Sequence, residues 1–269
     1  MPDLHAGFAE PKRTDAAILA EFLDEVDRIP AMQEIKAKML RAADLRPGMR
    51  VLDAGCGHGA EVIRQATAHP DVFFTGLDRN PDLLAIAQER GAGLKNVEWL
   101  LADLDDPGLP EGHFDVIRTE RVLMYAAGPA LGRQLDILIR LLRPGGRLVL
   151  SELDYGGILM PIGSQGEAVT RAVQEIMEKA MPEPWAGRRI PVELADRGMT
   201  DVVAEPYQFM PSEPVWQRIV VGTLRDALDR DPVPRPEIQA WLEEHAKSAA
   251  EHPFRGAFAG VLTSARRPA

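Results

Sequence analysis

Residues 51–59 have the sequence VLDAGCGHG, a short and mostly apolar run followed by three closely spaced glycines. Such a run predicts a buried strand, and the glycines let the backbone turn tightly and approach a ligand closely. Residues 60–68 then show the apolar spacing of a helix, whose first amides have no partners inside the helix. The segment predicts a strand, a turn and a helix with a ligand at the turn, although a purely structural turn fits it too.

The same alternation continues along the chain. Apolar runs that predict strands lie at 72–77, 97–101, 114–119 and 147–153, and helices are predicted at 81–90 and 131–142. A turn is expected at 144–146. This alternation predicts a doubly wound α/β fold, in which helices cover both faces of a parallel sheet. The ligand crevice of such a fold lies at the carboxyl ends of the strands, where the strand order reverses.

Acidic residues follow or end four of these strands. Asp53 lies beside the glycine turn, Asp78 ends the second strand, and Asp103 and Glu120 follow the third and fourth. A carboxylate after the second strand can accept the hydroxyls of a ribose, and one after the third can accept an adenine amine. The glycine turn and Asp78 fit either an adenosyl cofactor or a nicotinamide dinucleotide.

Five segments together resemble the class I S-adenosylmethionine (SAM)-dependent methyltransferases, in the branch that acts on small molecules such as quinones, sterols and natural products. In chain order they are VLDAGCGHG (51–59), FTGLDRNPDLL (74–84), WLLADLDD (99–106), FDVIRTERVLMY (114–125) and LLRPGGRLVLSELD (141–154). The resemblance implies a Rossmann-like sheet of about seven strands, mostly parallel, with the last strand antiparallel. Segments 201–210 and 254–265 are expected to supply the final hairpin.

The resemblance also implies which residues hold SAM, with S-adenosylhomocysteine (SAH) as the product. Asp53, Gly55, Cys56 and Gly57 line the methionine side, Asp78 binds the ribose with Arg79 beside it, Asp103 and Leu104 hold the adenine, and Glu120 and Arg121 lie near the amino acid end. Two positions depart from the family pattern. His58 stands where the family often has Thr or Ser, and Arg121 stands where this branch often has a small or apolar residue.

We expect four parts in the chain. Residues 1–47 form an N-terminal helical cap, 48–154 the SAM-binding core, 155–200 a lid insertion that sets substrate specificity, and 201–269 the remainder of the core sheet with C-terminal helices. Residues 1–13 are predicted to be a loose arm, followed by two helices that end near Ala43. Further helices are predicted at 167–181, 192–197, 213–228 and 236–250, with a loop at 182–187. Met160, Met177, Met181 and Trp185 are candidates for an apolar lid over the acceptor.

Methyl transfer from SAM is an in-line displacement, so the protein mainly holds the acceptor, the methyl group and the sulfur in line. A general base is needed only if the acceptor must lose a proton. The candidates for this base are Tyr125, Glu152, Asp154 and Tyr155, which follow or end the fourth and fifth strands.

Composition narrows the function classes further. The net charge of −10 over 269 residues disfavours nucleic-acid binding as the main role, because such proteins usually carry a basic surface. The one cysteine, Cys56, excludes an intrachain disulfide and fits a reducing compartment. We expect a soluble cytoplasmic protein, a monomer or homodimer, with a small-molecule acceptor, no nucleic-acid partner, no membrane insertion and no metal site.

Two alternatives stay open from the sequence. A nicotinamide-dependent oxidoreductase explains Gly55, Gly57 and Asp78, but it leaves Asp53, Asp103 and the turn at 144–146 unexplained as a set. A protein that binds SAM without transferring its methyl group, for instance in a cyclisation, carries the same cofactor motifs.

Overall fold

The computed structural model describes residues 4–10, 13–230, 235–246 and 254–269. Within them, a seven-stranded sheet has the order β3-β2-β1-β4-β5-β7-β6. Its strands are β1 (Arg50–Ala54), β2 (Phe73–Asp78), β3 (Val97–Leu101), β4 (Phe114–Glu120), β5 (Leu142–Leu153), β6 (Thr200–Phe209) and β7 (Phe258–Arg266). Strands β1 to β5 pair in parallel, whereas β7 is antiparallel to both β5 and β6. The predicted fold class, including the antiparallel final hairpin, is confirmed.

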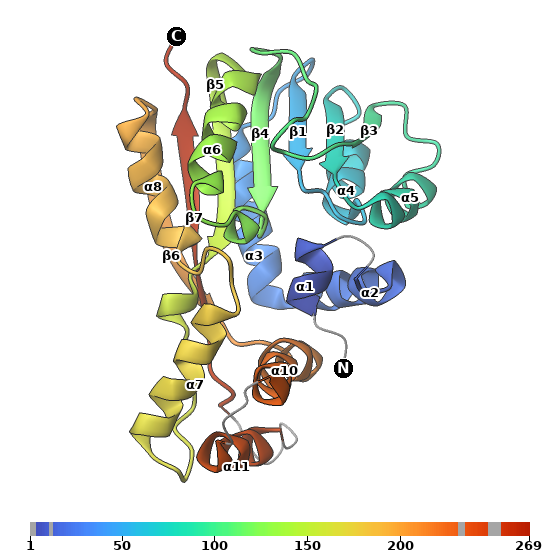
Figure 1. Cartoon of the computed structure of the whole chain (residues 1–269). Helices are drawn as coiled ribbons and strands as arrows, with labels where there is room; N and C mark the ends of the chain where they lie inside the picture. Colours follow the sequence, from blue (N-terminus) through green and yellow to red (C-terminus); the bar gives the residue numbers. More distant parts are fainter. Residues whose placement is uncertain (1–3, 11–12, 231–234, 247–253) are drawn as a thin grey trace.

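Helices cover both faces of this sheet (Figure 1). Helices α3 (Pro30–Ala43), α4 (Ala60–Ala68) and α5 (Pro81–Arg90) pack on one face, and α6 (Ala130–Leu141) and α8 (Ala186–Asp196) pack on the other. The chain order reverses between β1 and β4, since β2 and β3 lie on one side of β1 and β4 and β5 on the other. The ligand crevice is therefore expected at the carboxyl ends of these two strands.

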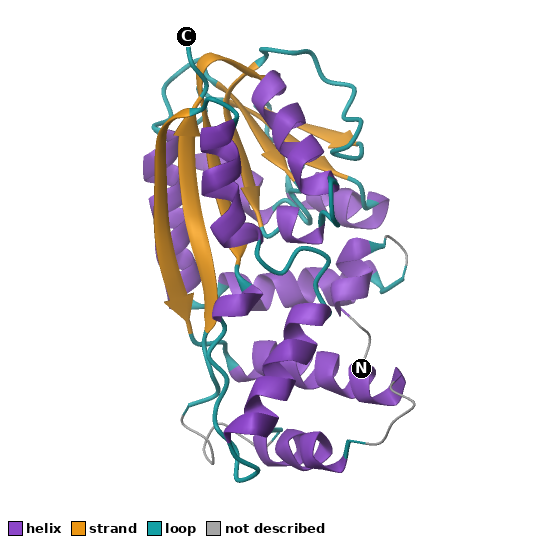
Figure 2. Ribbon diagram, turned by 60° about the vertical axis from the view of Figure 1, so that its left-hand side comes forward, coloured by secondary structure: helices purple, strands orange, loops and turns teal. Residues whose placement is uncertain are grey.

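A second group of helices lies beyond those carboxyl ends (Figures 1 and 2). It consists of α1 (Leu4–Ala9), α2 (Ala16–Asp27), α7 (Glu167–Lys179), α9 (Glu213–Trp216), the π-helical turn η3 (Gln217–Val221), α10 (Gly222–Arg230) and α11 (Pro236–His245). Short 3-10 turns follow β4 and β5, at η1 (Leu123–Tyr125) and η2 (Tyr155–Gly157). These helices cover the edge of the sheet at the carboxyl ends of its strands instead of one of its faces.

The structure corrects several predicted boundaries. The arm predicted at 1–13 contains α1, whose Leu4 is buried. Helix α8 begins at Ala186, inside the predicted loop, because Ala186, Ile190 and Leu194 form a buried stripe that outweighs Pro191. Strand β5 begins at Leu142 and runs through the predicted turn, where the Gly145 amide donates to the Arg267 carbonyl at 2.9 Å. Strand β7 begins at Phe258, and the predicted helical residues 247–250 lie outside the described residues.

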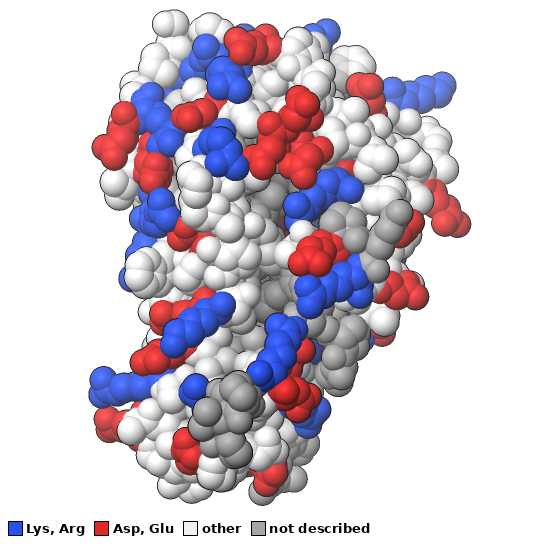
Figure 3. All heavy atoms as spheres, in the orientation of Figure 1, with Lys and Arg blue, Asp and Glu red and all other residues white. Residues whose placement is uncertain are grey.

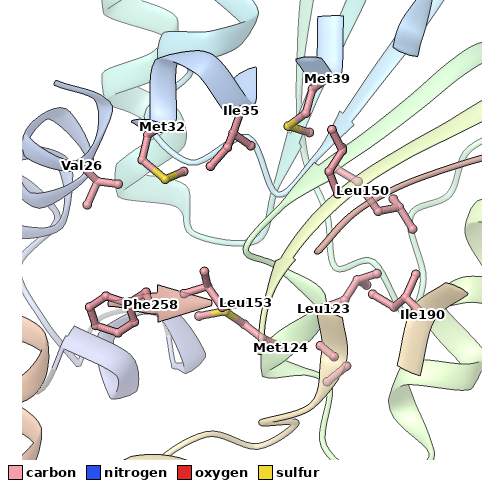
Figure 4. Packing of buried hydrophobic residues seen from close by; sticks show 14 of the residues in the cluster. Val26, Met32, Ile35, Met39, Leu123, Met124, Leu150, Leu153, Ile190 and Phe258 are labelled. Carbon is pink, nitrogen blue, oxygen red and sulfur yellow. The ribbon is translucent and has the colours of Figure 1, made fainter. Parts of the chain in front are cut away.

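The apolar core is continuous from the sheet into the N-terminal helices. Figure 4 shows Val26 of α2 and Met32 of α3 on one side, with Met124, Leu153 and Phe258 on the other. All five side chains are at most 6% exposed. None of the described helices is long and apolar enough to cross a membrane. On the face shown in Figure 3, acidic and basic side chains are intermingled.

Candidate functional site

A cavity that is partly open to solvent, with about 1280 Å³ of empty space when the adjoining open solvent is included, lies at the carboxyl ends of β1 to β5 and beneath α1 and α2. One half is lined by the residues that end or follow β1, β2 and β3, among them Gly55, Gly57, Asp78, Arg79, Asp103 and Leu104. The other half is mainly apolar and includes Phe8, Phe22, Tyr125, Tyr155, Phe209 and Phe258. Glu120 and Arg121, which end and follow β4, also belong to the wall.

The turn after β1 has the tight, glycine-dependent backbone that the sequence predicts. Gly55, Gly57 and Gly59 have φ angles of +83°, +55° and +78°, in the left-handed region that favours glycine. A Cβ atom on Gly55 would lie 2.3 Å from Cγ2 of Val122. The turn therefore packs directly against the loop after β4 and leaves its backbone exposed to the cavity.

Asp78 connects this turn to the start of α5. Its Oδ2 accepts a hydrogen bond from the Gly57 amide at 2.7 Å, and its Oδ1 accepts one from the Asn80 amide at 2.8 Å. Burial raises the pKa of Asp78, against the hydrogen bonds that lower it. The Arg79 backbone amide also contributes a hydrogen bond, and the roughly four acceptor sites of a carboxylate leave capacity for a ligand hydroxyl.

The loop after β3 forms the end of the polar half. Asp103 and Leu104 line the cavity there, and Leu83 of α5 and Val122 supply further apolar wall. The Asp103 side chain is half exposed and lies 3.8 Å from the Arg79 guanidinium. Arg79 in turn donates hydrogen bonds to the carbonyls of Phe8 and Ala9, which ties α1 to the rim of the cavity.

A buried network of ion pairs lies below the loops after β1 and β4. Arg118 of β4 donates to Asp53 at 2.9 Å and to Glu120 at 3.0 Å, and Glu120 also pairs with Arg121 at 3.0 Å and lies 3.8 Å from Lys36. Burial alone would raise the pKa of Glu120, but Lys36, Arg121 and Arg118 together lower it to about 2. Glu120 is therefore ionised at neutral pH.

The sequence interpretation missed Lys36 and Arg118. The signal for Arg118 was present, because an arginine inside a buried parallel strand requires an anionic partner. Asp53, for which a place beside SAM was implied, instead occupies its carboxylate with Arg118 and does not belong to the cavity wall. Burial raises the pKa of Asp53 in spite of this partner.

Two of the four candidate bases lie at the cavity and two lie away from its wall. Tyr125 and Tyr155 line it. Glu152 accepts hydrogen bonds from Thr119 Oγ1 at 3.0 Å and from the amides of Val122 and Met124, so it fixes the loop after β4 from beneath. Asp154 pairs with Arg188 at 2.5 and 2.7 Å.

Other residues that the sequence analysis singled out lie outside the cavity wall. Cys56 is beneath the glycine turn and outside the cavity wall, and burial raises its pKa well above the ordinary value. His58 is buried and lies 2.8 Å from Asp24 of α2, so it links the turn to the cap. The methionines expected in a lid, Met160, Met177 and Met181, are buried in the core instead.

Apolar residues that the sequence interpretation did not single out form much of the wall. Phe8 and Phe22 come from α1 and α2, Phe209 and Phe258 from the final hairpin, and Val215 and Ile219 from α9 and η3. No local sequence signal marks them, because their common position depends on the packing of segments far apart in the chain.

Residues 45–192 match a family model described as a methyltransferase domain, which is more than half of the chain. The chain belongs to this methyltransferase family. The family resemblance drawn from the sequence is thereby confirmed, and the oxidoreductase alternative has no support from the match.

Relatives and solved structures extend this comparison. The chain is 31% identical over 231 residues to an uncharacterized 37.1 kDa protein of transposon TN4556 from Streptomyces fradiae, covering 84% of this chain and 66% of that protein. It is 33% identical to 27-O-demethylrifamycin SV methyltransferase from Amycolatopsis mediterranei, over 49% of this chain and 47% of that enzyme. The chain thus spans two thirds or less of these relatives.

The fold is shared with a phosphoethanolamine N-methyltransferase 2 from Haemonchus contortus, solved in complex with SAM. That structure superposes with a TM-score of 0.61 at 17% identity and covers 99% of this chain and 60% of the other.

Proposed function

We propose that this chain transfers the methyl group of SAM to a small apolar molecule, as methyltransferases of natural-product metabolism do. The observation that carries the proposal is the two-part cavity. Its polar half brings the glycine turn, Asp78 and Asp103 to one wall, and its apolar half adjoins them at the carboxyl end of β4. The similarity to the rifamycin methyltransferase supports a natural-product acceptor.

The residues of the polar half fit SAM. The glycine turn would hold the methionine part, Asp78 would accept the ribose hydroxyls, and Asp103 would accept the adenine amine. Leu83, Leu104 and Val122 would flank the ring. Once bound, the sulfonium supplies an activated methyl group, so the remaining task of the protein is to position the acceptor and exclude water.

The apolar half serves that task. Its aromatic and aliphatic wall excludes water from a flat or hydrophobic acceptor and strengthens the electrostatic interactions inside. Alignment of the reacting atoms can account for about 7–11 kcal/mol of the barrier. The aromatic residues of α1, α2, β6 and β7 therefore act by orientation.

Calorimetry with the purified protein tests the cofactor assignment. SAM and SAH are expected to bind and NAD(H) is not, and Asp78→Ala is expected to weaken SAH binding at least tenfold. Asp71→Ala serves as the matched control, because Asp71 is an exposed residue before β2. Binding of NAD(H) without SAM would overturn the proposal.

A second assay separates methyl transfer from binding alone. SAM labelled in its methyl group is incubated with apolar acceptors, and the label is expected in the product. A product that forms without label, while SAM remains unchanged, would show that the chain uses SAM for other chemistry.

A further inference from the structure

The apolar half of the cavity contains charged groups at one place. Among the described residues that line it, these are Glu120 and Arg121, at the junction with the cofactor half. Val122, the next residue, packs against Gly55 of the polar half. On the other side, the charge of Arg121 lowers the pKa of Tyr155, although burial outweighs it and raises that pKa well above the ordinary value.

Arg121 is held in an unfavourable backbone conformation. Its φ of +59° is left-handed, which costs a residue with a side chain about 1–2 kcal/mol relative to its preferred conformation. The Arg121 amide donates to the Ser151 carbonyl at 2.9 Å, and the next amide donates to Glu152, so β5 enforces this conformation. Strain of this kind persists where the surrounding structure over-determines it, typically at functional sites.

The Arg121 guanidinium retains hydrogen-bonding capacity. Its side chain is 16% exposed, and one nitrogen, Nη2, donates to Glu120 at 3.0 Å. Its Nε is buried and has no hydrogen-bond partner among the described residues. Because Nε is inaccessible, a ligand would bind instead at Nη1, which donates to none of the described residues.

The charges beneath the cavity balance before any ligand binds. Four cations (Lys36, Arg64, Arg118 and Arg121) face four anions (Asp27, Asp53, Glu61 and Glu120) in one connected network. Bound SAM adds a net positive charge, because its sulfonium is in excess over the amine and carboxylate pair. The cavity wall adds Asp78, Arg79 and Asp103, whose net charge of −1 offsets that of bound SAM, so the acceptor half is left with the Glu120 and Arg121 pair.

The apolar half also lacks a suitable base among its described residues. Glu120 is ionised with a pKa of about 2 and is surrounded by cations, so it is a weak proton acceptor. Burial raises the pKa of the Tyr155 phenol well above its ordinary value, so this phenol carries its proton at neutral pH. Glu152 and Asp154 point their carboxylates into other hydrogen bonds. An acceptor that is already ionised needs no base.

We infer that the acceptor is an apolar acid, that Arg121 binds its anionic oxygen, and that this oxygen is methylated. This inference rests on the proposed function. The ionised oxygen forms a bond to the methyl carbon while the carbon–sulfur bond breaks and its electron pair stays on sulfur. No proton is released, and the products are a neutral methyl ester or ether and SAH.

Matched acids and amides test the inference. Benzoate, 2-naphthoate and anthracene-2-carboxylate, and the three corresponding amides, are titrated by calorimetry into protein saturated with SAH. At least one acid is expected to bind ten times more tightly than its amide. Arg121→Met is expected to abolish this preference and Arg121→Lys to retain part of it. Arg171→Met, at an exposed arginine of α7 outside the cavity wall, is expected to leave it intact.

The same acids are then incubated with methyl-labelled SAM, and label is expected in a base-labile ester. Equal binding of acid and amide, no binding of any acid, or a preference that survives Arg121→Met would overturn the inference while SAH binding still supports the proposed function. Acids that bind without ester formation would overturn the assignment of their oxygen as methyl acceptor. Failure of SAH to bind would instead overturn the proposed function.

Discussion

Asp103 and Asp105 lie two residues apart in the loop after β3 but have different surroundings. Asp103 lines the cavity, whereas Asp105 accepts a hydrogen bond from Gln134 at 3.3 Å and lies 3.8 Å from Arg133. A hydrogen bond to a charged group contributes about 1.5–3 kcal/mol. Asp103→Ala is therefore expected to weaken SAM binding about 10- to 100-fold in calorimetry. Asp105→Ala should change the affinity less than twofold, and equal effects of the two substitutions would argue against adenine at this wall.

A second residue, Glu152, makes stability depend on pH. Burial raises its pKa from 4.5 to about 7, against the hydrogen bonds from the loop after β4. A raised folded-state pKa contributes stability that is complete below 4.5 and is lost as the pH rises through about 7. The difference between these two pKa values corresponds to about 3 kcal/mol of stability.

Urea unfolding of the wild type and of Glu152→Gln measures this contribution. Between pH 4.5 and pH 8, the free energy of unfolding of the wild type should fall by about 3 kcal/mol relative to that of the variant. Comparison with the variant cancels the other titrating groups. A difference that stays constant over this range would show that Glu152 ionises normally.

At the scale of single elements, the sequence predicted those helices and strands whose boundaries depend on the local pattern of apolar residues. Strands β1 to β4 and helices α4 to α6 were predicted to within one residue at each boundary, because buried parallel strands and one-sided helices have distinct apolar periods. Helix α8 was predicted too short, since Pro191 is a helix breaker locally and tertiary burial of Ile190 overrides it.

The residues of the candidate site were likewise predicted where local sequence pattern determines their place, and missed where tertiary packing does. Asp78, Asp103 and the glycine turn were predicted because they directly follow their strands, and parallel strands bring such residues to one edge. Phe209, Ile219 and Phe258 were not, since their place in the wall depends on how the final hairpin and η3 fold back. Glu152 and Asp154 were predicted at the acceptor, but side-chain direction at the end of β5 turns them to other partners.

Helix α4 provides an element-scale prediction. Its N-cap, Gly59, has a φ of +78°, and a Cβ atom there would lie 2.6 Å from Trp99 of β3 and 2.7 Å from the Ala87 Cβ of α5. Gly59→Ala therefore adds steric overlap to backbone strain. The substitution is expected to lower the free energy of unfolding by more than about 3 kcal/mol. Gly108, with a φ of +63° and open space around it, is the control. Gly108→Ala should cost about 1–2 kcal/mol, and similar denaturation midpoints for both variants would contradict the packing.

At the scale of the whole molecule, salt bridges and hydrogen bonds close the cap over the cavity from several directions. Arg90 of α5 forms a bidentate pair with Asp24 of α2 at 2.9 and 3.0 Å. Arg218 of η3 lies 3.1 Å from Glu21 and 3.6 Å from Glu25, also on α2. Helix α2 is thus tied both to the Rossmann-like core and to the C-terminal helices.

Hydrogen exchange tests whether the cap closes over the cofactor. SAH at 100 times its Kd should stabilise the fold by about 2.7 kcal/mol and slow every amide that exchanges through global unfolding. Amides that exchange through local opening should respond only where the ligand closes the structure. Added protection is therefore expected in α2 and in the loops after β1 to β3, with little change in the edge strand β6, which lies outside the cofactor half. Protection gained in β6 but not in α2 would place the cofactor away from the cap and contradict the arrangement from which the function is argued.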